Sequence, residues 1–137
     1  MKQAGCNEVD KSMNKMEEFN YTVEQFADLQ LLRYKVYGFE ELSLKQKELI
    51  YYLSQAALQG RDILFDQNGK YNLLIRKMLE TVYTEYQGDR TDVNFVNLET
   101  YLKRIWFSNG IHHHYASDKF VPGFTPEFLR DALNSVD

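Results

Sequence analysis

Three consecutive histidines, His112, His113 and His114, are the residues in this sequence whose types are best suited to chemistry. Imidazole groups bind metal ions and carry protons near neutral pH. Adjacent side chains do not converge easily on one ion, and the zinc pattern of peptidases instead pairs two histidines one helical turn apart, with a glutamate between them as general base. No His–Glu pair occurs here. The run therefore favours a loop whose histidines hydrogen-bond to the backbone or line a cleft, with a plain surface loop and a zinc site as the alternatives.

The other reactive groups offer no catalytic arrangement. The single cysteine, Cys6, has no histidine close to it in the sequence that could activate it as a nucleophile. The glycines are isolated and form no phosphate-binding loop, and the paired glutamates at 17–18 and 40–41 are typical of solvated faces. The sequence thus predicts no catalytic residue and no metal ligand in this chain.

The composition narrows the class of protein to which this chain can belong and the partners that it can have. The chain has 137 residues, of which 44% are hydrophobic, which is typical of one globular domain. The formal charge of −4 and the lack of clustered Lys and Arg argue against a nucleic-acid partner, and no apolar run is long enough to predict a transmembrane segment. The ten tyrosines and nine phenylalanines either line partly solvent-exposed surfaces such as cleft walls or fill a helical core.

The N-terminal residues 1–25 are predicted to form a flexible leader or tether, with a short frayed helix over 7–20 as the alternative. Within them, Ala4-Gly5-Cys6 matches the end of a bacterial lipoprotein cleavage box, in which the cysteine is acylated. Only five residues precede Cys6 and no apolar signal core is present, so either a signal has been removed or the match arises by chance. The first interpretation predicts a periplasmic lipoprotein, and the second leaves a cytoplasmic location open.

The remaining residues, 26–137, are predicted to be mainly α, with a four-helix core and one N-terminal extended segment. Capping signals mark the helix ends: Ser43 and Gln46 have capping-box spacing, Gly110 is expected as a left-handed cap, and Thr125 precedes a first-turn proline. The predicted helices span residues 43–65, 71–86, 94–109 and 125–134.

Apolar residues recur at helical spacing on one face of each predicted helix. These faces are predicted to be buried, so replacing Leu53 or Leu102 by alanine should remove about 2–5 kcal/mol of stability. The predicted faces consist of Leu49, Ile50, Leu53, Ala56, Ala57 and Gly60 in the first helix; Leu74, Ile75, Met78, Val82 and Tyr86 in the second; Leu98, Tyr101, Leu102, Ile105 and Trp106 in the third; and Phe128, Leu129, Ala132 and Leu133 in the fourth.

A strand is predicted over residues 26–36, ahead of the helices. Apolar and basic residues alternate from Leu32 to Val36, although Phe26 and Leu29 also fit a helical stripe. No second strand pattern is apparent, so this strand would lack a partner for its backbone groups. That lack indicates that part of the structure belongs to a larger protein.

The third helix and the loop after it read Glu99-Thr-Tyr-Leu-Lys-Arg-Ile-Trp-Phe-Ser-Asn-Gly110 and then Ile-His-His-His-Tyr-Ala-Ser-Asp-Lys-Phe-Val-Pro122. This resembles the N-terminal region of the dipeptidyl-peptidase III family, whose eukaryotic members carry Asn-Tyr-Lys-Ser-Phe-Gly-Asp-x-Lys-Phe-x-Pro at the same spacing. Bacterial members are more similar, with a His-rich loop and segments like Ser43-Leu-Lys-Gln-Lys-Glu-Leu-Ile-Tyr-Tyr-Leu53 and Gln55-Ala-Ala-Leu-Gln-Gly-Arg61. The resemblance extends over residues 26–133.

The resemblance implies that the chain is the helical N-terminal part of the lower lobe of a two-lobed α+β enzyme, a zinc exopeptidase that removes dipeptides from the N-terminus of short peptides. The family holds its zinc with a His-Glu-x-x-x-His motif and a glutamate from a Glu-Glu-x-x-Arg motif, and neither motif is present here. The chain alone is therefore expected to bind no zinc and to be inactive. Its expected partners are the rest of the enzyme and a short peptide, and residues 26–36 would be a strand of the family's small β-barrel.

In the family, the loop after the third helix lines the cleft near the N-terminal residue of the peptide. Matched residue by residue, the family's Ser-Phe pair falls on His114 and Tyr115, and its lysine falls on Lys119. The resemblance therefore implies that these three residues bind substrate. The sequence departs from the family at 111–113 and 116–117, which leaves the local chemistry of this subsite open.

Two other functions compete with this one. The first is a stand-alone helical binding module, tethered by lipid in the periplasm if Cys6 is acylated. The second is a metal-binding protein that uses the histidines, which metal analysis of the purified chain would reveal. A reading frame that continues past Asp137 into a His-Glu-x-x-x-His motif would exclude the stand-alone module.

Overall fold

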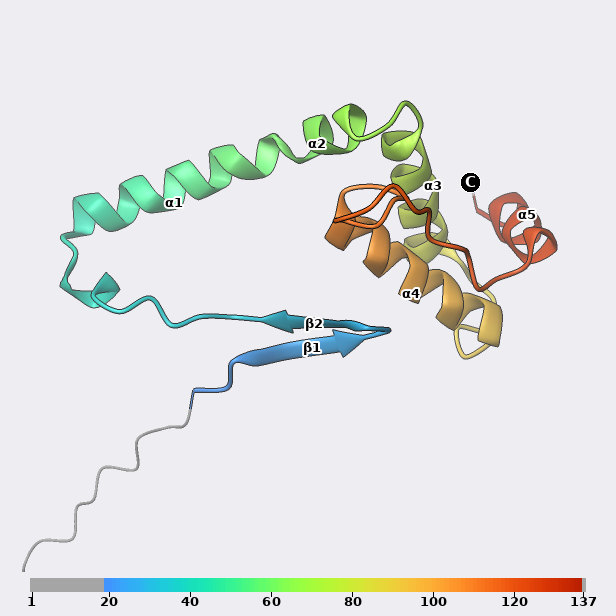
Figure 1. Ribbon diagram of the computed structural model, residues 1–137, viewed down its shortest axis with the longest axis horizontal. Helices are drawn as coiled ribbons and strands as arrows, with labels where there is room; N and C mark the ends of the chain where they lie inside the picture. The colour runs from blue at the N-terminus through green and yellow to red at the C-terminus, as the bar shows by residue number, and fades with distance from the viewer. Residues whose placement is uncertain (1–18, 137) are drawn as a thin grey trace, which may run out of the picture.

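The computed structural model describes residues 19–136, which are mainly helical with one small sheet (Figure 1). The prediction of a mainly α fold with a four-helix core and an extended N-terminal segment is confirmed. Cys6 and the first 18 residues of the predicted leader lie outside the described residues. In chain order the elements are β1 (Thr22–Phe26), β2 (Leu29–Leu32), the 3-10 helix η1 (Phe39–Glu41), α1 (Leu44–Gln59), α2 (Arg61–Gln67), α3 (Asn72–Glu85), α4 (Val93–Ser108) and α5 (Pro126–Asn134).

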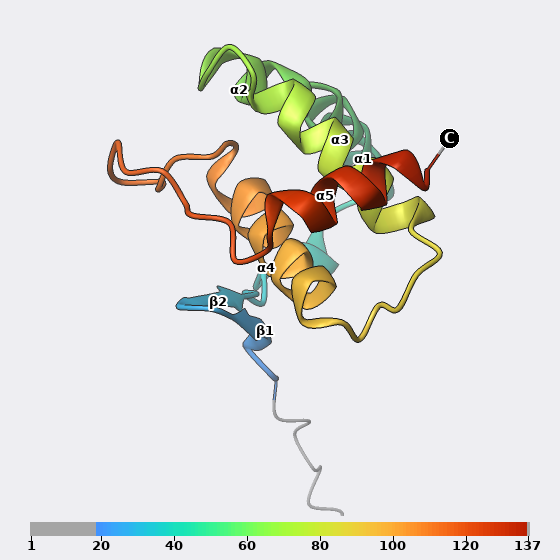
Figure 2. The same ribbon diagram turned by 90° about the vertical axis from the view of Figure 1, so that its right-hand side faces the viewer.

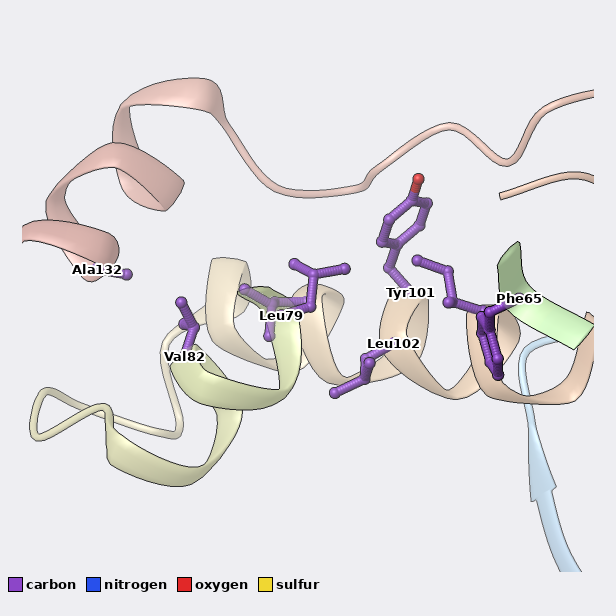
Figure 3. Packing of buried hydrophobic residues seen from close by; sticks show 8 residues of the cluster. Phe65, Leu79, Val82, Tyr101, Leu102 and Ala132 are labelled. Carbon is purple, nitrogen blue, oxygen red and sulfur yellow. The ribbon is translucent and has the colours of Figure 1, made fainter. Parts of the chain in front are cut away.

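The core lies between α3 and α4, with α5 covering one side of both helices (Figure 2). Apolar side chains recur on the inner faces of α3 and α4, while α2 and α5 contribute one buried side chain each (Figure 3). Leu102 is completely buried, which confirms the predicted inner face of the third helix. The buried cluster consists of Phe65, Leu79, Val82, Leu98, Tyr101, Leu102, Ile105 and Ala132.

Helix α1 does not join this core. It begins with the predicted capping box, in which the Ser43 amide donates to Gln46 Oε1 at 2.9 Å and the Gln46 amide donates to Ser43 Oγ at 3.4 Å. It then projects away from the other helices (Figure 1), and none of its residues is buried. Leu53 is 60% exposed, so the prediction that the apolar face of this helix is buried is wrong in the part of the chain that the structure describes. The apolar stripe is present in the sequence, but no element within those residues covers it.

The helix predicted over 43–65 is divided in two at Gly60, which ends α1 and begins α2 with φ −80° and ψ −3°. Two further predictions of burial are wrong. Leu74 is 66% exposed because it lies about 140° around α3 from the buried Leu79. Trp106 is 41% exposed, and its indole Nε1 donates to Glu80 Oε1 at 2.7 Å, which holds the ring at the surface between α3 and α4.

The prediction of a lone strand over 26–36 is also wrong. The structure forms an antiparallel hairpin in which β2 pairs with β1, with Phe26 opposite Leu29 and Gln25 opposite Gln30. The two-residue turn consists of Ala27 and Asp28, and Ala27 adopts a positive φ of 50°. This turn lacks the Asn-Gly or Gly signals by which such hairpins are recognised in a sequence. Thr22–Phe26 therefore supplies the partner that the sequence pattern did not reveal.

Two ion pairs hold the hairpin against α4. Lys103 Nζ lies 2.6 Å from Glu24 Oε1 on β1 and 2.9 Å from Glu99 Oε1 on α4 itself. Arg104 pairs with Asp28 in the hairpin turn. Charged groups therefore join the sheet to α4, and Phe26 and Leu31 line a pocket together with Trp106 and Phe107 of that helix. Across residues 19–136, no helix has the length and apolar character required to cross a membrane.

Candidate functional site

The loop between α4 and α5, which extends beyond the end of α4 (Figure 2), carries the three histidines. It folds back on itself through an antiparallel bridge between His112 and Lys119. The Phe120 amide donates to the Ile111 carbonyl and the His113 amide donates to the Asp118 carbonyl, both at 2.8 Å. Because backbone bonds close both sides of the bridge, the tip of the loop is held in a defined conformation.

The aromatic rings of the loop pack against one another. The rings of His113 and His114 are stacked with their centroids 4.4 Å apart, and the rings of His114 and Phe107 of α4 form a T-shaped pair with their centroids 5.0 Å apart. Tyr115 lies beside His114 at 4.2 Å but is 88% exposed. The Tyr115 amide donates to His113 Nδ1 at 3.2 Å, so that nitrogen acts as an acceptor. The loop therefore presents a wall of flat rings with one phenol open to solvent.

Beneath the loop lies a cavity of about 560 Å³. Its floor contains Asn72, the first residue of α3, and Ser108, the last residue of α4, which are 2% and 9% exposed. The cavity thus lies where the N-terminus of one core helix meets the C-terminus of the other. Its lining consists of Asn68, Asn72, Ser108, Gly110, His112, His113, His114, Tyr115, Ala116 and Ser117.

The orientation of the Asn72 side chain is fixed by the chain that leaves α4. The Ile111 amide donates to Asn72 Oδ1 at 3.3 Å, which identifies the other terminal atom, Nδ2, as the donor. Asn109 ends α4 in the left-handed conformation, with φ 53° and ψ 36°, so the prediction of Gly110 as the left-handed cap is wrong. Gly110 has a φ of 156°, and a Cβ there would overlap the Asn72 amide nitrogen. The absent side chain at this position makes room for Asn72.

Three buried polar atoms around this cavity have no hydrogen-bond partner in the described part of the chain: Asn72 Nδ2, Ser108 Oγ and His114 Nδ1. A buried polar group without a partner destabilises the fold by about 1–3 kcal/mol. Each of these atoms has less than 1 Å² of accessible surface, so the surrounding protein encloses it.

The structure brings together two of the three substrate-binding residues implied by the resemblance. His114 and Tyr115 line the cavity, whereas Lys119 is exposed and lies across the bridge from His112, outside the lining. Asn72 and Ser108 were missed because they have no local motif. The signal that could have indicated them is Gly110, since a glycine directly after a helix end often permits close approach of another group.

A zinc ion does not fit this site. Within residues 19–136, no group of three His, Cys, Asp or Glu side chains is placed to hold a metal ion. His113 and His114 are stacked, and His114 Nδ1 is buried against the cavity. The site is a cavity lined by amides, hydroxyls and imidazoles. Comparison of the sequence with models of protein families and with curated proteins gave no match.

Proposed function

We propose that this chain is the N-terminal part of a bacterial zinc-dependent dipeptidyl peptidase, and that it forms a wall of the peptide-binding cleft without supplying the zinc. The observation that carries the proposal is the cavity beneath the loop that resembles the family's cleft-lining segment. His114 and Tyr115 line this cavity together with Asn72 and Ser108. Asn72 and Ser108 come from the ends of α3 and α4, so the cavity lies between the loop and the helical core.

The roles of the loop residues follow from their exposure. Tyr115, 88% exposed, offers a phenol ring to the first side chain of a bound peptide. The His114 imidazole can accept a hydrogen bond from the peptide when it is neutral. Lys119 is exposed on the outer side of the bridge and would contact only a part of the peptide that extends beyond the cavity.

The apolar surface of α1 supports a larger enzyme as the partner. Leu49, Ile50 and Leu53 form part of the predicted inner face of this helix, and each is 43% to 60% exposed. Contiguous apolar surface of this kind marks contacts with other proteins or domains. In this proposal the remainder of the enzyme covers α1 and extends the small sheet.

The test is to express the complete reading frame and this 137-residue chain separately. The complete protein should release dipeptides from an arginyl-arginyl amide substrate and lose this activity on treatment with a metal chelator. The 137-residue chain should be inactive with or without added zinc, because metal-assisted hydrolysis needs paired ligands and a general base. Chelator-sensitive activity in the 137-residue chain, or a reading frame without a His-Glu-x-x-x-His motif, would refute the proposal.

A stand-alone binding module is the second candidate. One observation favours it: residues from α3, from α4 and from the loop after α4 meet around one cavity within residues 19–136. The same reading-frame experiment decides between the two candidates.

A further inference from the structure

We infer that α1 is packed between two apolar layers in the complete protein, one on each of two opposite sides of the helix. The inference rests on the proposed function for the identity of the partner, which is the remainder of the same enzyme. It goes beyond that function because it states how the partner is arranged around α1. Both layers are uncharged where they meet residues 49–60.

The first apolar stripe of α1 is the face predicted from the sequence. Leu49, Ile50 and Leu53 are exposed, because α1 projects away from the helical core (Figure 1). Ala56 and Ala57 continue the stripe toward the end of the helix and are exposed as well. These two side chains are small, so the backbone of another element can approach α1 closely there.

A second apolar stripe runs along the opposite side of α1. Leu44, Tyr51 and Leu58 recur at intervals of seven residues, which is about two turns of an α-helix. They are 42% to 72% exposed. Tyr51 lies about 160° around the helix axis from Leu53, because each residue advances by about 100°. The two stripes therefore face nearly opposite directions, and one flat surface cannot cover both.

The charged residues of α1 all lie near its beginning. They are Lys45, Lys47 and Glu48, and residues 49–60 contain no charged residue. The hydroxyl of Ser54 donates to a carbonyl one turn earlier in the same helix at 2.6 Å, so this polar group needs no partner from outside. A helix with apolar side chains on opposite sides is typical of a protein interior. The facing layers are apolar and uncharged, since a charge buried against residues 49–60 would lack a partner.

Two other occupants fit this pattern less well. A second copy of the chain that packed its α1 against this one would cover one stripe and leave the other in water, because two helices meet along one line of contact. A membrane surface binds helices that have one apolar face and a polar face rich in Lys and Arg. Residues 49–60 contain neither Lys nor Arg. A larger folded partner is the occupant that covers both sides.

Cysteine labelling measures the covering of each stripe. Leu53→Cys reports on the first stripe and Leu58→Cys on the second, while Gln59→Cys is the matched control because it lies about 100° or more around the helix from both. Each variant also carries Cys6→Ser, so that only one thiol reacts. The rate of reaction with N-ethylmaleimide is measured in the 137-residue chain and in the complete protein. Both stripe variants should react about tenfold or more slowly in the complete protein, and the control should be slowed least.

Slowing at only one stripe, or at neither, would overturn the inference, as would equal slowing of the control. If a stripe variant does not fold in the complete protein, Ala57→Cys or Tyr51→Cys replaces it on the same stripe. Slower labelling of the 137-residue chain at higher concentration would assign the stripe to a second copy. Slower labelling of that chain with anionic lipid vesicles would assign the stripe to a membrane, and either result also overturns the inference.

The inference and the proposed function fail separately. A complete protein that protects both stripes but has no peptidase activity would refute the proposed function alone. An active enzyme in which one stripe reacts as fast as in the 137-residue chain would refute only the arrangement around α1.

Discussion

Lys103 on α4 and Glu24 on β1 lie 79 positions apart in the chain, yet their Nζ and Oε1 atoms are 2.6 Å apart. The same ammonium group is 2.9 Å from Glu99, and the hydrogen bonds to Glu24 and then Glu99 raise the pKa of Lys103 above its usual value. The lysine therefore stays charged throughout the neutral range. Together with the Arg104–Asp28 pair, it helps to hold the hairpin against α4.

Glu24→Gln should loosen the hairpin while the core stays intact. The pair is partly exposed, so the free energy of unfolding should fall by only about 0.5 kcal/mol. Amide hydrogen exchange across 22–32 should become faster, because the hairpin opens more often once its tie to α4 is weakened. Hydrogen exchange measured by NMR tests this, with Glu127→Gln as an exposed control. Unchanged exchange in the hairpin would show that the ion pair does not hold it.

Leu102→Ala and Leu53→Ala should have very different effects in the 137-residue chain. Leu102 is completely buried, so its truncation should lower the free energy of unfolding by about 2–5 kcal/mol. Leu53 is 60% exposed on α1, and its truncation should change that energy by less than about 0.5 kcal/mol. Urea denaturation of both variants measures the difference. A large loss from Leu53→Ala would mean that α1 is covered in the protein in solution.

Gly110→Ala should be destabilising, and Gly60→Ala should not. At Gly110 the φ of 156° is uncommon for residues with a side chain, and the new Cβ would overlap the Asn72 amide, so a loss of about 1–3 kcal/mol is expected. At Gly60 the backbone is right-handed and a Cβ would lie 3.5 Å from the Ala57 carbonyl oxygen, so alanine should stabilise by about 0.4–1 kcal/mol. Thermal melts of the two variants give both values. Equal melting temperatures would contradict the described geometry at Gly110.

Alkaline unfolding should depend on Tyr101. Burial raises the pKa of its phenol above the usual value of 10.0. A group whose folded pKa is raised contributes stability that is present below the unfolded pKa and is lost as the pH rises through the folded pKa. The parent should therefore lose stability above about pH 10, and Tyr101→Phe should lose less over the same range.

Urea denaturation between about pH 8 and pH 11 measures this effect. Lys103 loses its contribution in the same range, so the difference between parent and variant is the relevant quantity. The exposed Tyr115→Phe variant is the control and should follow the parent. Identical slopes for Tyr101→Phe and the parent would exclude the burial effect.

Tyr115→Ala in the complete enzyme should raise KM and leave kcat nearly unchanged, because an aromatic contact made equally in the ground state and the transition state affects binding alone. The expected loss is about 1–2 kcal/mol, the scale of one aromatic contact in a partly exposed subsite. Steady-state kinetics with a short peptide and a melting curve are measured on the same variant. A lower melting temperature with an unchanged KM would assign the loop to structure and not to substrate.

The helices were predictable because their signals are local. The Ser43–Gln46 capping box and the Thr125 cap form as expected, and the predicted bounds of α3, α4 and α5 differ from the observed ones by one residue at each end where they differ at all. The hairpin was not predictable in the same way, because an alanine occupies the positive-φ position of its turn. Such a turn is stabilised by the pairing on either side of it and by the contacts with α4.

Burial and the site depend on distant parts of the chain. The stripe on α1 has the correct period, but periodicity alone cannot reveal whether a covering surface exists. Asn72 could not be identified from the sequence for a similar reason. It lies 39 positions from Ile111, and the two residues meet only after α3 and α4 have packed. The three histidines and Tyr115 could be identified from the sequence because they are consecutive residues in one loop.

The contact between Lys103 and Glu24 also closes the chain into a frame, with α1 as one side and the hairpin as another (Figure 1). While the hairpin stays against α4, both ends of α1 are connected to the core, one through α2 and the other through the hairpin. If both ion pairs of the hairpin were broken, α1 would stay attached to the core only through α2, and it could then rotate about the junction at Gly60. A helix of its length measures about 24 Å, so a rotation of about 20° at the pivot moves the far end by about 8 Å. The two ion pairs of the hairpin thereby limit how far the exposed apolar face of α1 can move.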